Sequence, residues 1–138
     1  MKLVLVAAAA LLRGDTVLLA RRPEGKPLAG LWEFPGGKFE IGETPECALT
    51  RELQEELGIS VDPESLEALT FASHPLSEDK CLLMPLWTVR AWSGGEPIGK
   101  EGQELAWLTA DQLGTDDFIM PPADYPLVPH VQRALKSQ

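Results

Sequence analysis

Apolar residues dominate two runs near the start of the chain. The first run covers residues 3–12 and the second covers residues 16–20. Apolar runs of this kind, bounded by turn residues, are typical of buried strands. Arg13, Gly14 and Asp15 lie between the two runs and predict a turn, since Gly and Asp accept the backbone angles of tight turns. The pattern therefore predicts two buried strands joined by a short connection.

The next strong pattern is helical. Leucine recurs at every fourth position across residues 49–57, which would place an apolar stripe on one side of a helix. Thr44 is a good N-cap, Pro45 suits the first helical position, and Gly58 stands where a left-handed C-cap is usual. We therefore expect a helix that begins at Pro45 and ends just before Gly58.

The second half of the chain predicts further strands and two short helical pieces. Residues 82–92 are rich in strand-forming side chains and predict one strand, or two strands broken near Pro85. Residues 105–108 predict another short strand. Residues 109–113 resemble a capped helical turn, and residues 127–135 have helical apolar spacing. Helices and strands thus alternate, which predicts an α/β fold around a mixed sheet.

Length and composition favour a single domain over residues 1–138. The chain is 44% hydrophobic and has neither an internal repeat nor a low-complexity linker. Its formal net charge of −9 argues against a nucleic-acid polymer or a membrane as partner, because both are bound through clustered Lys and Arg. A small phosphate ligand is compatible with this charge, since bound metal ions reverse the local field.

The N-terminus resembles a signal peptide only superficially. Lys2 is its single charge, no convincing small-residue cleavage site precedes Arg13, and the apolar run is too short to span a bilayer. We therefore expect a cytoplasmic protein. Cys47 and Cys81 fit no metal-binding spacing, and we expect both to be reduced residues of the core or of a helix.

Three carboxylates in the predicted helix are the first sign of chemistry. Glu52, Glu55 and Glu56 have the spacing i, i+3 and i+4, which places them within about 100° of arc on one helix face. Like charges on one face destabilise a helix, and a hard divalent cation with oxygen ligands removes that repulsion. The alternative is an ordinary solvated acidic face.

The segment from Gly37 to Ile59 resembles the signature of the Nudix hydrolases. It has the expected residue at every fixed position: a glycine, then Glu43 after five residues, then Arg51-Glu52-Leu53-Gln54-Glu55-Glu56-Leu57-Gly58-Ile59 after seven more. The resemblance implies an α/β/α sandwich around a mixed sheet. It also implies a pyrophosphohydrolase that cuts a nucleoside diphosphate linked to another group. Its cofactor would be Mg²⁺, which Mn²⁺ can replace.

Outside this signature segment the likeness narrows to the MutT-like branch of the family. It is carried by Arg21-Arg22, by residues 31–38 (LWEFPGGK), by residues 99–103 (GKEGQ) and by residues 121–124 (PPAD). That branch implies an 8-oxo-dGTP or 8-oxo-GTP diphosphatase, which releases the monophosphate and pyrophosphate and cleans the nucleotide pool before DNA replication. The partner would be a small nucleotide, and the protein a monomer or homodimer.

The likeness also implies roles for the acidic residues. Glu55 and Glu56 would bind metal together with the backbone carbonyl of Gly36. Glu52 would either bind metal or take the proton from water, and we favour it as the general base. Glu101 would be a further metal ligand.

Glu104 is the alternative to Glu101 for that further ligand. The remaining fixed positions of the signature are expected to be structural: Gly37, Glu43, Arg51 and Gly58. Glu43 and Arg51 would form an ion pair that fastens the loop to the helix and so holds the glutamates in place.

Substrate-binding residues are expected on both sides of the signature segment. They are Arg22, Glu33, Phe34, Pro35, Gly36, Lys38, Lys80 and Asp124. Arg22 and Lys38 would grip the triphosphate, because the phosphates carry more charge than the metal ions neutralise. The tryptophans and the two histidines are expected to be structural, and they are Trp32, Trp87, Trp92, Trp107, His74 and His130.

Asp124 decides between two substrates. The MutT proteins that the chain resembles carry Asn here, which can donate to O6 and accept from N7–H of 8-oxoguanine. An ionised Asp only accepts, so it could pair with N1–H and N2–H₂ of guanine or with N4–H₂ of cytosine. It would repel O6 unless it were buried and protonated. We favour 8-oxoguanine, with CTP, dCTP or 5-methyl-dCTP as the alternative. A third hypothesis is a protein that binds nucleotides without hydrolysing them. It predicts that some metal-binding glutamates have been replaced, and none of them is missing here.

Overall fold

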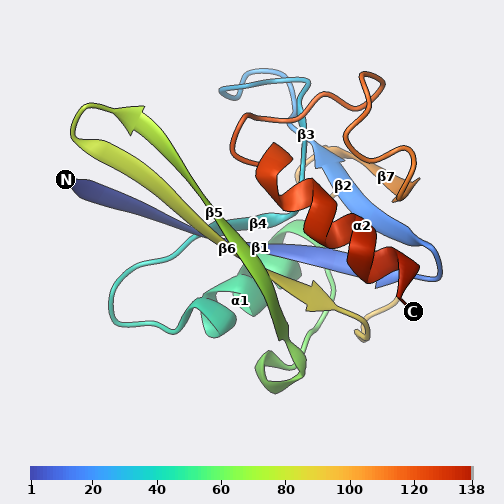
Figure 1. Cartoon of the computed structure of the whole chain (residues 1–138). Helices are drawn as coiled ribbons and strands as arrows, with labels where there is room; N and C mark the ends of the chain where they lie inside the picture. Colours follow the sequence, from blue (N-terminus) through green and yellow to red (C-terminus); the bar gives the residue numbers. More distant parts are fainter. Residues whose placement is uncertain (138) are drawn as a thin grey trace.

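The computed structural model describes residues 1–137, which form a mixed sheet region with one helix on each side (Figure 1). The strands are β1 (Lys2–Arg13), β2 (Thr16–Arg21), β3 (Trp32–Glu33), β4 (Gly36–Lys38), β5 (Glu67–Ser77), β6 (Lys80–Val89) and β7 (Glu104–Thr109). The helices are α1 (Pro45–Leu57) and α2 (Val128–Lys136), and the 3₁₀ turns are η1 (Pro63–Ser65) and η2 (Tyr125–Leu127). The expected α/β/α architecture is confirmed.

Strand β1 belongs to both parts of the sheet. Along most of its length it pairs in parallel with β6 and, on its other edge, antiparallel with β4, where Ala8 lies opposite Gly36. At its end it pairs with β2, which in turn pairs with β3 and β7. Strand β5 completes the sheet beside β6. The short strand β4 is thereby held against the middle of β1, directly before the loop that leads to α1.

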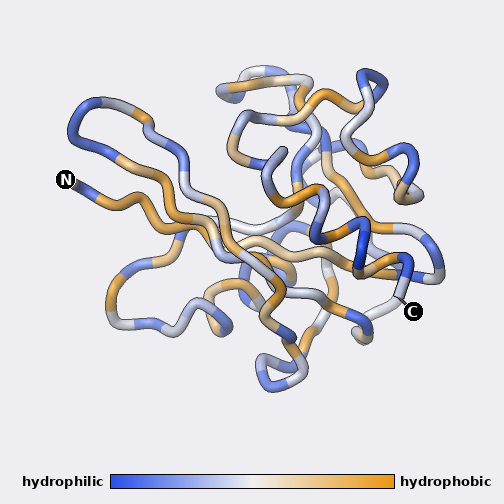
Figure 2. Tube along the Cα trace, viewed as in Figure 1, coloured by the Kyte–Doolittle hydropathy of each residue, from blue (hydrophilic) through white to orange (hydrophobic). Residues whose placement is uncertain are grey.

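Alternate residues of β1 point into two separate cores. Even-numbered residues 8–12 join the core that packs under α2, and odd-numbered residues 7–11 join the core that packs under α1. The leucine stripe of α1 is fully buried in the latter core, at Leu49, Leu53 and Leu57. Burying each such side chain contributes about 1.5–3 kcal/mol. Figure 2 shows the apolar residues concentrated along these central strands.

Local signals in the sequence predicted the two N-terminal strands and helix α1 correctly, whereas the short strands β3 and β4 were not predicted. Both N-terminal strands, their connecting turn and helix α1 are present at the expected positions. The Thr44 hydroxyl accepts a hydrogen bond from the Cys47 N–H at 3.2 Å, and Gly58 ends the helix with a left-handed φ of 71°. Cys47 is exposed, Cys81 is partly buried, and both are free thiols as expected.

The structure decides between the alternatives for residues 82–92 and contains the turn expected at residues 109–113. Pro85 does not break the strand, because β6 continues through it; only the pairing with β1 is interrupted, between Leu83 and Leu86. Proline has no N–H to donate, so a local gap in the ladder is sufficient. Residues 109–113 form the single turn that was expected after β7: the N–H of Leu113 donates to the carbonyl of Thr109 at 3.1 Å, and the turn does not continue into a longer helix.

Strand β5 was not predicted. Its only buried residue is Ala72, so it lacks the apolar pattern that marks the other long strands. It is held mainly by its antiparallel pairing with β6. Within residues 1–137, neither helix is long and apolar enough to cross a lipid bilayer.

Candidate active site

Two adjoining cavities open beside β3 and β4. The first, here called the acidic cavity, measures about 220 Å³ and is lined by the carboxylates Glu33, Glu56 and Glu101 together with several cationic side chains. The second, here called the apolar cavity, measures about 400 Å³. Its walls come from β1, β5, β6 and the 121–124 segment, and they include Val4, Val6, Leu28, Phe34, His74, Leu76, Leu82, Met84, Pro121, Pro122, Ala123 and Asp124.

Three residues line both cavities: Arg22, Glu33 and Gly36. The two cavities are therefore two parts of one site. A ligand with a highly charged end and a flat, mostly apolar end fits such a pair, with each end in the matching environment.

Helix α1 presents Glu56 to the acidic cavity, where it meets other negative charges. Burial, followed by the charges of Glu52, Glu101 and Glu33, raises the pKa of Glu56 to about 8. The carboxyl groups of Glu52 and Glu56 also share a hydrogen bond. A carboxyl in this environment binds a proton more tightly than usual, or a cation in its place.

Arg51 connects three carboxylates on the solvent side of α1. Its guanidinium lies 3.2 Å from Glu43, 3.1 Å from Glu52 and 3.7 Å from Glu55. The expected ion pair with Glu43 is thus present. Glu55 is 57% exposed and does not line the acidic cavity, so in this side-chain arrangement it is separated from Glu56.

Gly36 and Gly37 allow β4 to approach its neighbours closely. A Cβ atom at position 36 would collide with the carbonyl oxygen of Ala7 on β1, and one at position 37 would collide with the carboxylate of Glu52. Glycine is required at position 36, where the obstacle is backbone, whereas a side chain at position 37 would displace the flexible Glu52 side chain. Because Gly37 has no side chain, the backbone of β4 is in direct contact with the carboxylate of Glu52.

The donors around the acidic cavity have the chemistry that a hard divalent cation prefers. Glu56, Glu101 and the Gly36 backbone line it together, and Glu52 adjoins Glu56. In the described residues 1–137, no three acidic, histidine or cysteine side chains are close enough to hold a metal ion. Holding one with three carboxylates therefore requires side-chain rotations on α1, and Glu55 would have to leave Arg51.

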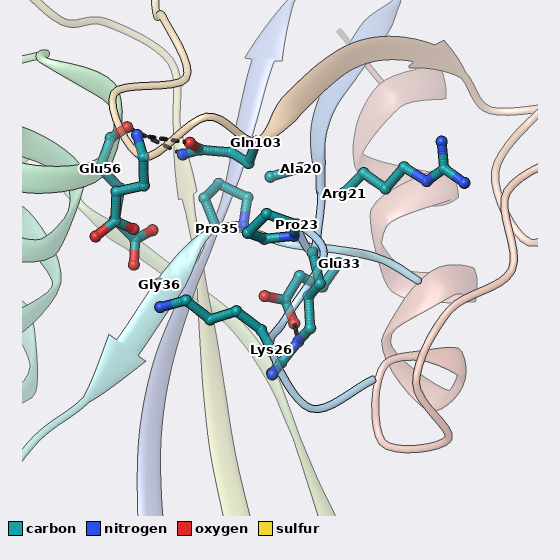
Figure 3. A pocket seen from close by; sticks show the side chains of 11 residues that line it. Ala20, Arg21, Pro23, Lys26, Glu33, Pro35, Gly36, Glu56 and Gln103 are labelled. Carbon is teal, nitrogen blue, oxygen red and sulfur yellow. Dashed lines mark hydrogen bonds and ion pairs between the residues drawn. The ribbon is translucent and has the colours of Figure 1, made fainter. Parts of the chain in front are cut away.

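Cationic side chains face the carboxylates from the loop after β2. The Nε of Arg22 donates to Glu33 at 2.8 Å, and Lys26 reaches into the acidic cavity (Figure 3). Arg21 instead turns its guanidinium away from Glu33 and Glu56 (Figure 3). It pairs with Glu104 at 3.2 Å. Glu104 does not line the acidic cavity, so Glu101 is the better placed of the two.

Asp124 is the buried polar group of the apolar cavity. It is 5% exposed, and its Oδ2 accepts a hydrogen bond from the backbone N–H of Phe34 at 3.3 Å. Burial, together with the negative charge of Glu33, raises the pKa of Asp124 to about 7, against the opposing effects of the Phe34 N–H and Arg22. Near neutral pH this carboxyl is present in both protonation states.

Comparison with known proteins agrees with this geometry. Residues 2–131 match the NUDIX domain family. The chain belongs to the Nudix family.

Two Nudix relatives of known name are similar along most of the chain. The chain is 41% identical to the 8-oxo-dGTP diphosphatase of Escherichia coli (strain K12) over 119 residues, which cover 86% of this chain and 88% of that protein. It is 37% identical to the CTP pyrophosphohydrolase of the same organism over 129 residues, which cover 93% and 90%.

The crystal structure of the MutT NUDIX hydrolase from Burkholderia pseudomallei superposes with a TM-score of 0.80 at 30% identity. The superposition covers 95% of this chain and 99% of that one. Nudix hydrolases generally need a divalent metal ion, which matches the donors of the acidic cavity.

Most of the residues expected from the Nudix likeness lie at this site. Lys38 and Pro35 each line one of the cavities. Lys80 is separate from them: it begins β6 opposite Lys2 of β1, and it lines neither cavity. The tryptophans line neither cavity either, and Trp92 stacks on Trp107 with ring centres 6.2 Å apart.

The polar cavity residues that the sequence did not assign to the site include Lys26, His74 and Gln103. His74 lies on β5, so its place at the apolar cavity follows from a strand that the sequence did not reveal. The neighbouring wall of the apolar cavity, on β6, was partly predictable from the spacing of its apolar residues. Leu82 and Met84 are two residues apart, and this spacing places both on one face of β6.

Proposed function

We propose that this Nudix protein is a metal-dependent nucleoside triphosphate pyrophosphohydrolase that prefers 8-oxo-dGTP or 8-oxo-GTP, releasing the monophosphate and pyrophosphate. Mg²⁺ is the proposed cofactor, and Mn²⁺ would replace it. The triphosphate would lie in the acidic cavity and the base in the apolar cavity. The relative named 8-oxo-dGTP diphosphatase, 41% identical over 119 residues, supports this choice.

The observation that carries the proposal is the burial of Asp124 beside the Phe34 N–H. Because that N–H donates to Oδ2, a neutral Asp124 would keep its proton on Oδ1. It would then donate from Oδ1 to O6 of the base and accept at Oδ2 from N7–H. Only 8-oxoguanine offers this pair, because ordinary guanine has no hydrogen on N7. A neutral aspartic acid can therefore do here what an asparagine amide does.

The acidic cavity would carry the hydrolysis. A bound divalent cation supplies charge neutralisation on the phosphates and makes a nearby water more acidic. Glu55, Glu56, Glu101 and the carbonyl of Gly36 are the proposed ligands. We assign the general base to Glu52, whose carboxylate lies against the backbone of Gly37.

Positive charges near the same cavity would bind the phosphates. Arg22 can contact two phosphate oxygens with its planar guanidinium, and Lys26 and Lys38 add point charges on either side. Arg22 is already paired with Glu33, so binding a triphosphate would redistribute that ion pair.

A CTP or dCTP pyrophosphohydrolase is the second candidate, and the same residue favours it in the other protonation state. Ionised Asp124 can accept hydrogen bonds from N4–H₂ of cytosine, including that of 5-methyl-dCTP. The relative named CTP pyrophosphohydrolase, 37% identical over 129 residues, supports this alternative.

The test is steady-state kcat/KM with Mg²⁺ for 8-oxo-dGTP, dGTP, CTP and 5-methyl-dCTP, with pyrophosphate and orthophosphate measured separately. A large preference for 8-oxo-dGTP with release of pyrophosphate is expected. Equal rates on dGTP and 8-oxo-dGTP would contradict the proposed specificity. Preference for a cytosine nucleotide would move the chain to the second candidate with the same hydrolytic residues.

A further inference from the structure

Gln103 connects two acidic residues that come from distant parts of the chain. Its Nε2 donates to the backbone carbonyl of Glu56 at 3.0 Å, and its Oε1 accepts from the backbone N–H of Glu101 at 2.9 Å. Figure 3 shows the Gln103 amide beside Glu56 on the wall of the acidic cavity. One neutral side chain thus joins the last turn of α1 to the loop before β7.

The rest of this loop also rests on the end of α1. The N–H of Ile98 donates to the carbonyl of Leu57, and the N–H of Lys100 donates to the carbonyl of Glu56, each at 3.1 Å. Residues 99–102 then form a tight turn closed by a 3.1 Å hydrogen bond from Gly102 to Gly99. Glu101 lies at the tip of this turn, where the Gln103 side chain is the recorded hydrogen-bond partner of its N–H.

Electrostatics oppose this arrangement. Glu56 and Glu101 both face the acidic cavity, and the charge of Glu101 contributes to the raised pKa of Glu56. Repulsion between the two carboxylates pushes the exposed turn away from the helix. A side-chain amide resists this movement without adding charge, because it donates and accepts at the same time.

We propose that Gln103 is a positioning residue that holds the carboxylate of Glu101 opposite that of Glu56, so that both can bind one divalent cation. This inference rests on the proposed function for the identity of the site. Residues that orient metal ligands typically change metal affinity by roughly 10-fold to 100-fold when they are replaced.

The first test measures Mn²⁺ binding to the substrate-free protein by calorimetry and by electron paramagnetic resonance. Gln103→Met keeps the length of the side chain and removes both hydrogen bonds, and we expect it to weaken Mn²⁺ binding by roughly 10-fold to 100-fold. The matched control is Gln112→Met, since Gln112 accepts from the Thr109 N–H at 2.9 Å in the turn after β7 and lines neither cavity. Wild-type affinity in Gln103→Met would overturn the inference.

A second test asks whether Gln103 acts through Glu101. Amide hydrogen exchange at Glu101 should become faster in Gln103→Met and stay unchanged in Gln112→Met. In a Glu101→Gln background, Gln103→Met should change Mn²⁺ affinity by less than about twofold, because the coupled residues share one effect. Full additivity of the two substitutions would contradict a positioning role.

These measurements do not depend on turnover. If the wild-type protein hydrolyses none of the four nucleotides yet Gln103→Met weakens Mn²⁺ binding, the proposed substrate is wrong and the role of Gln103 stands. If the wild type hydrolyses 8-oxo-dGTP and Gln103→Met leaves metal binding and amide exchange unchanged, the proposed function stands and the inference is wrong. A wild-type protein that binds no Mn²⁺ would also overturn the inference.

Discussion

The carboxyl group of Asp124 accepts a hydrogen bond at 3.3 Å from the backbone N–H of Phe34, although the two residues are 90 positions apart in the chain. This contact joins the 121–124 segment to the strands that lead into the signature segment. It also fixes which oxygen of Asp124 must remain an acceptor. The other oxygen is the one whose proton decides what the apolar cavity can bind.

Substrate preference should therefore depend on pH through Asp124. Its pKa is raised to about 7, so the neutral form predominates below that pH and the ionised form above it. We expect the ratio of kcat/KM for 8-oxo-dGTP to that for CTP to fall as the pH rises from 6 to 8. Asp124→Asn should remove this change in the ratio, and a ratio that changes equally in both proteins would contradict the assignment.

The same shift has a consequence for stability. The folded protein binds the Asp124 proton more tightly than the unfolded chain, whose ordinary pKa is 3.8. Asp124 therefore lowers the stability of the fold as the pH rises from about 3.8 to about 7. Chemical denaturation across this range should show a weaker decrease in unfolding free energy for Asp124→Asn than for the wild type.

Glu56→Gln should abolish most hydrolysis and leave the fold intact. Losing a metal ligand removes several kcal/mol of transition-state stabilisation, which corresponds to at least about a hundredfold in kcat. Circular dichroism should remain that of the wild type. Glu46→Gln, on the first turn of the same helix and outside both cavities, is the control. Intact turnover in Glu56→Gln would show that the signature glutamates do not support catalysis. Loss of turnover in a folded Glu56→Gln protein would rule out the hypothesis of a non-catalytic nucleotide sensor.

Gly37→Ala should displace Glu52. The new Cβ would collide with the Glu52 carboxylate, and relieving such a collision costs about 1–3 kcal/mol of stability. We expect a lower melting temperature and a lower kcat. Adding Glu52→Asp shortens the opposing side chain by one methylene and should restore the melting temperature without restoring kcat. If the double variant were as unstable as Gly37→Ala, the collision with Glu52 would not be the cause of the lost stability.

Arg51→Ala should affect activity more than stability. Its side chain is 44% exposed, and solvent-exposed ion pairs contribute little to stability. Arg90→Ala is a matched control, because Arg90 is also 44% exposed and pairs with Glu67 at 3.0 Å away from both cavities. Similar melting temperatures with a roughly tenfold lower kcat in Arg51→Ala alone would mean that Arg51 orients Glu52 and Glu55. An equal kcat in both variants would exclude that role.

Helix α1 was predictable because its signals are local. The cap at Thr44, the left-handed Gly58 and the leucine stripe all lie within one short segment. The orientation of its carboxylates was less predictable. Glu55 and Glu56 are adjacent in sequence, yet one faces Arg51 and the other faces the acidic cavity, because their directions depend on the ion pairs that form around the helix.

The cavities themselves depend on contacts that no local pattern reveals. Arg21 and Glu104 meet across the pairing of β2 with β7, which turns the Arg21 guanidinium away from the carboxylates of the acidic cavity. Lys26 enters that cavity from an irregular loop without a periodic signal. His74 reaches the apolar cavity on β5, a strand with one buried residue. Such placements follow from the tertiary arrangement and had to be seen in the structure.

Arg22, Glu33 and Gly36 line both cavities, and other residues of the 20–38 segment line one cavity or the other. The far wall of the apolar cavity is made by the β5–β6 hairpin and by residues 121–124, whereas the carboxylates of α1 stand on the opposite side of β4. Substitutions in that far wall can therefore change which base is accepted while the bond-breaking groups stay as they are. A scaffold divided in this way can acquire a new nucleotide preference through a few replacements in these two wall segments.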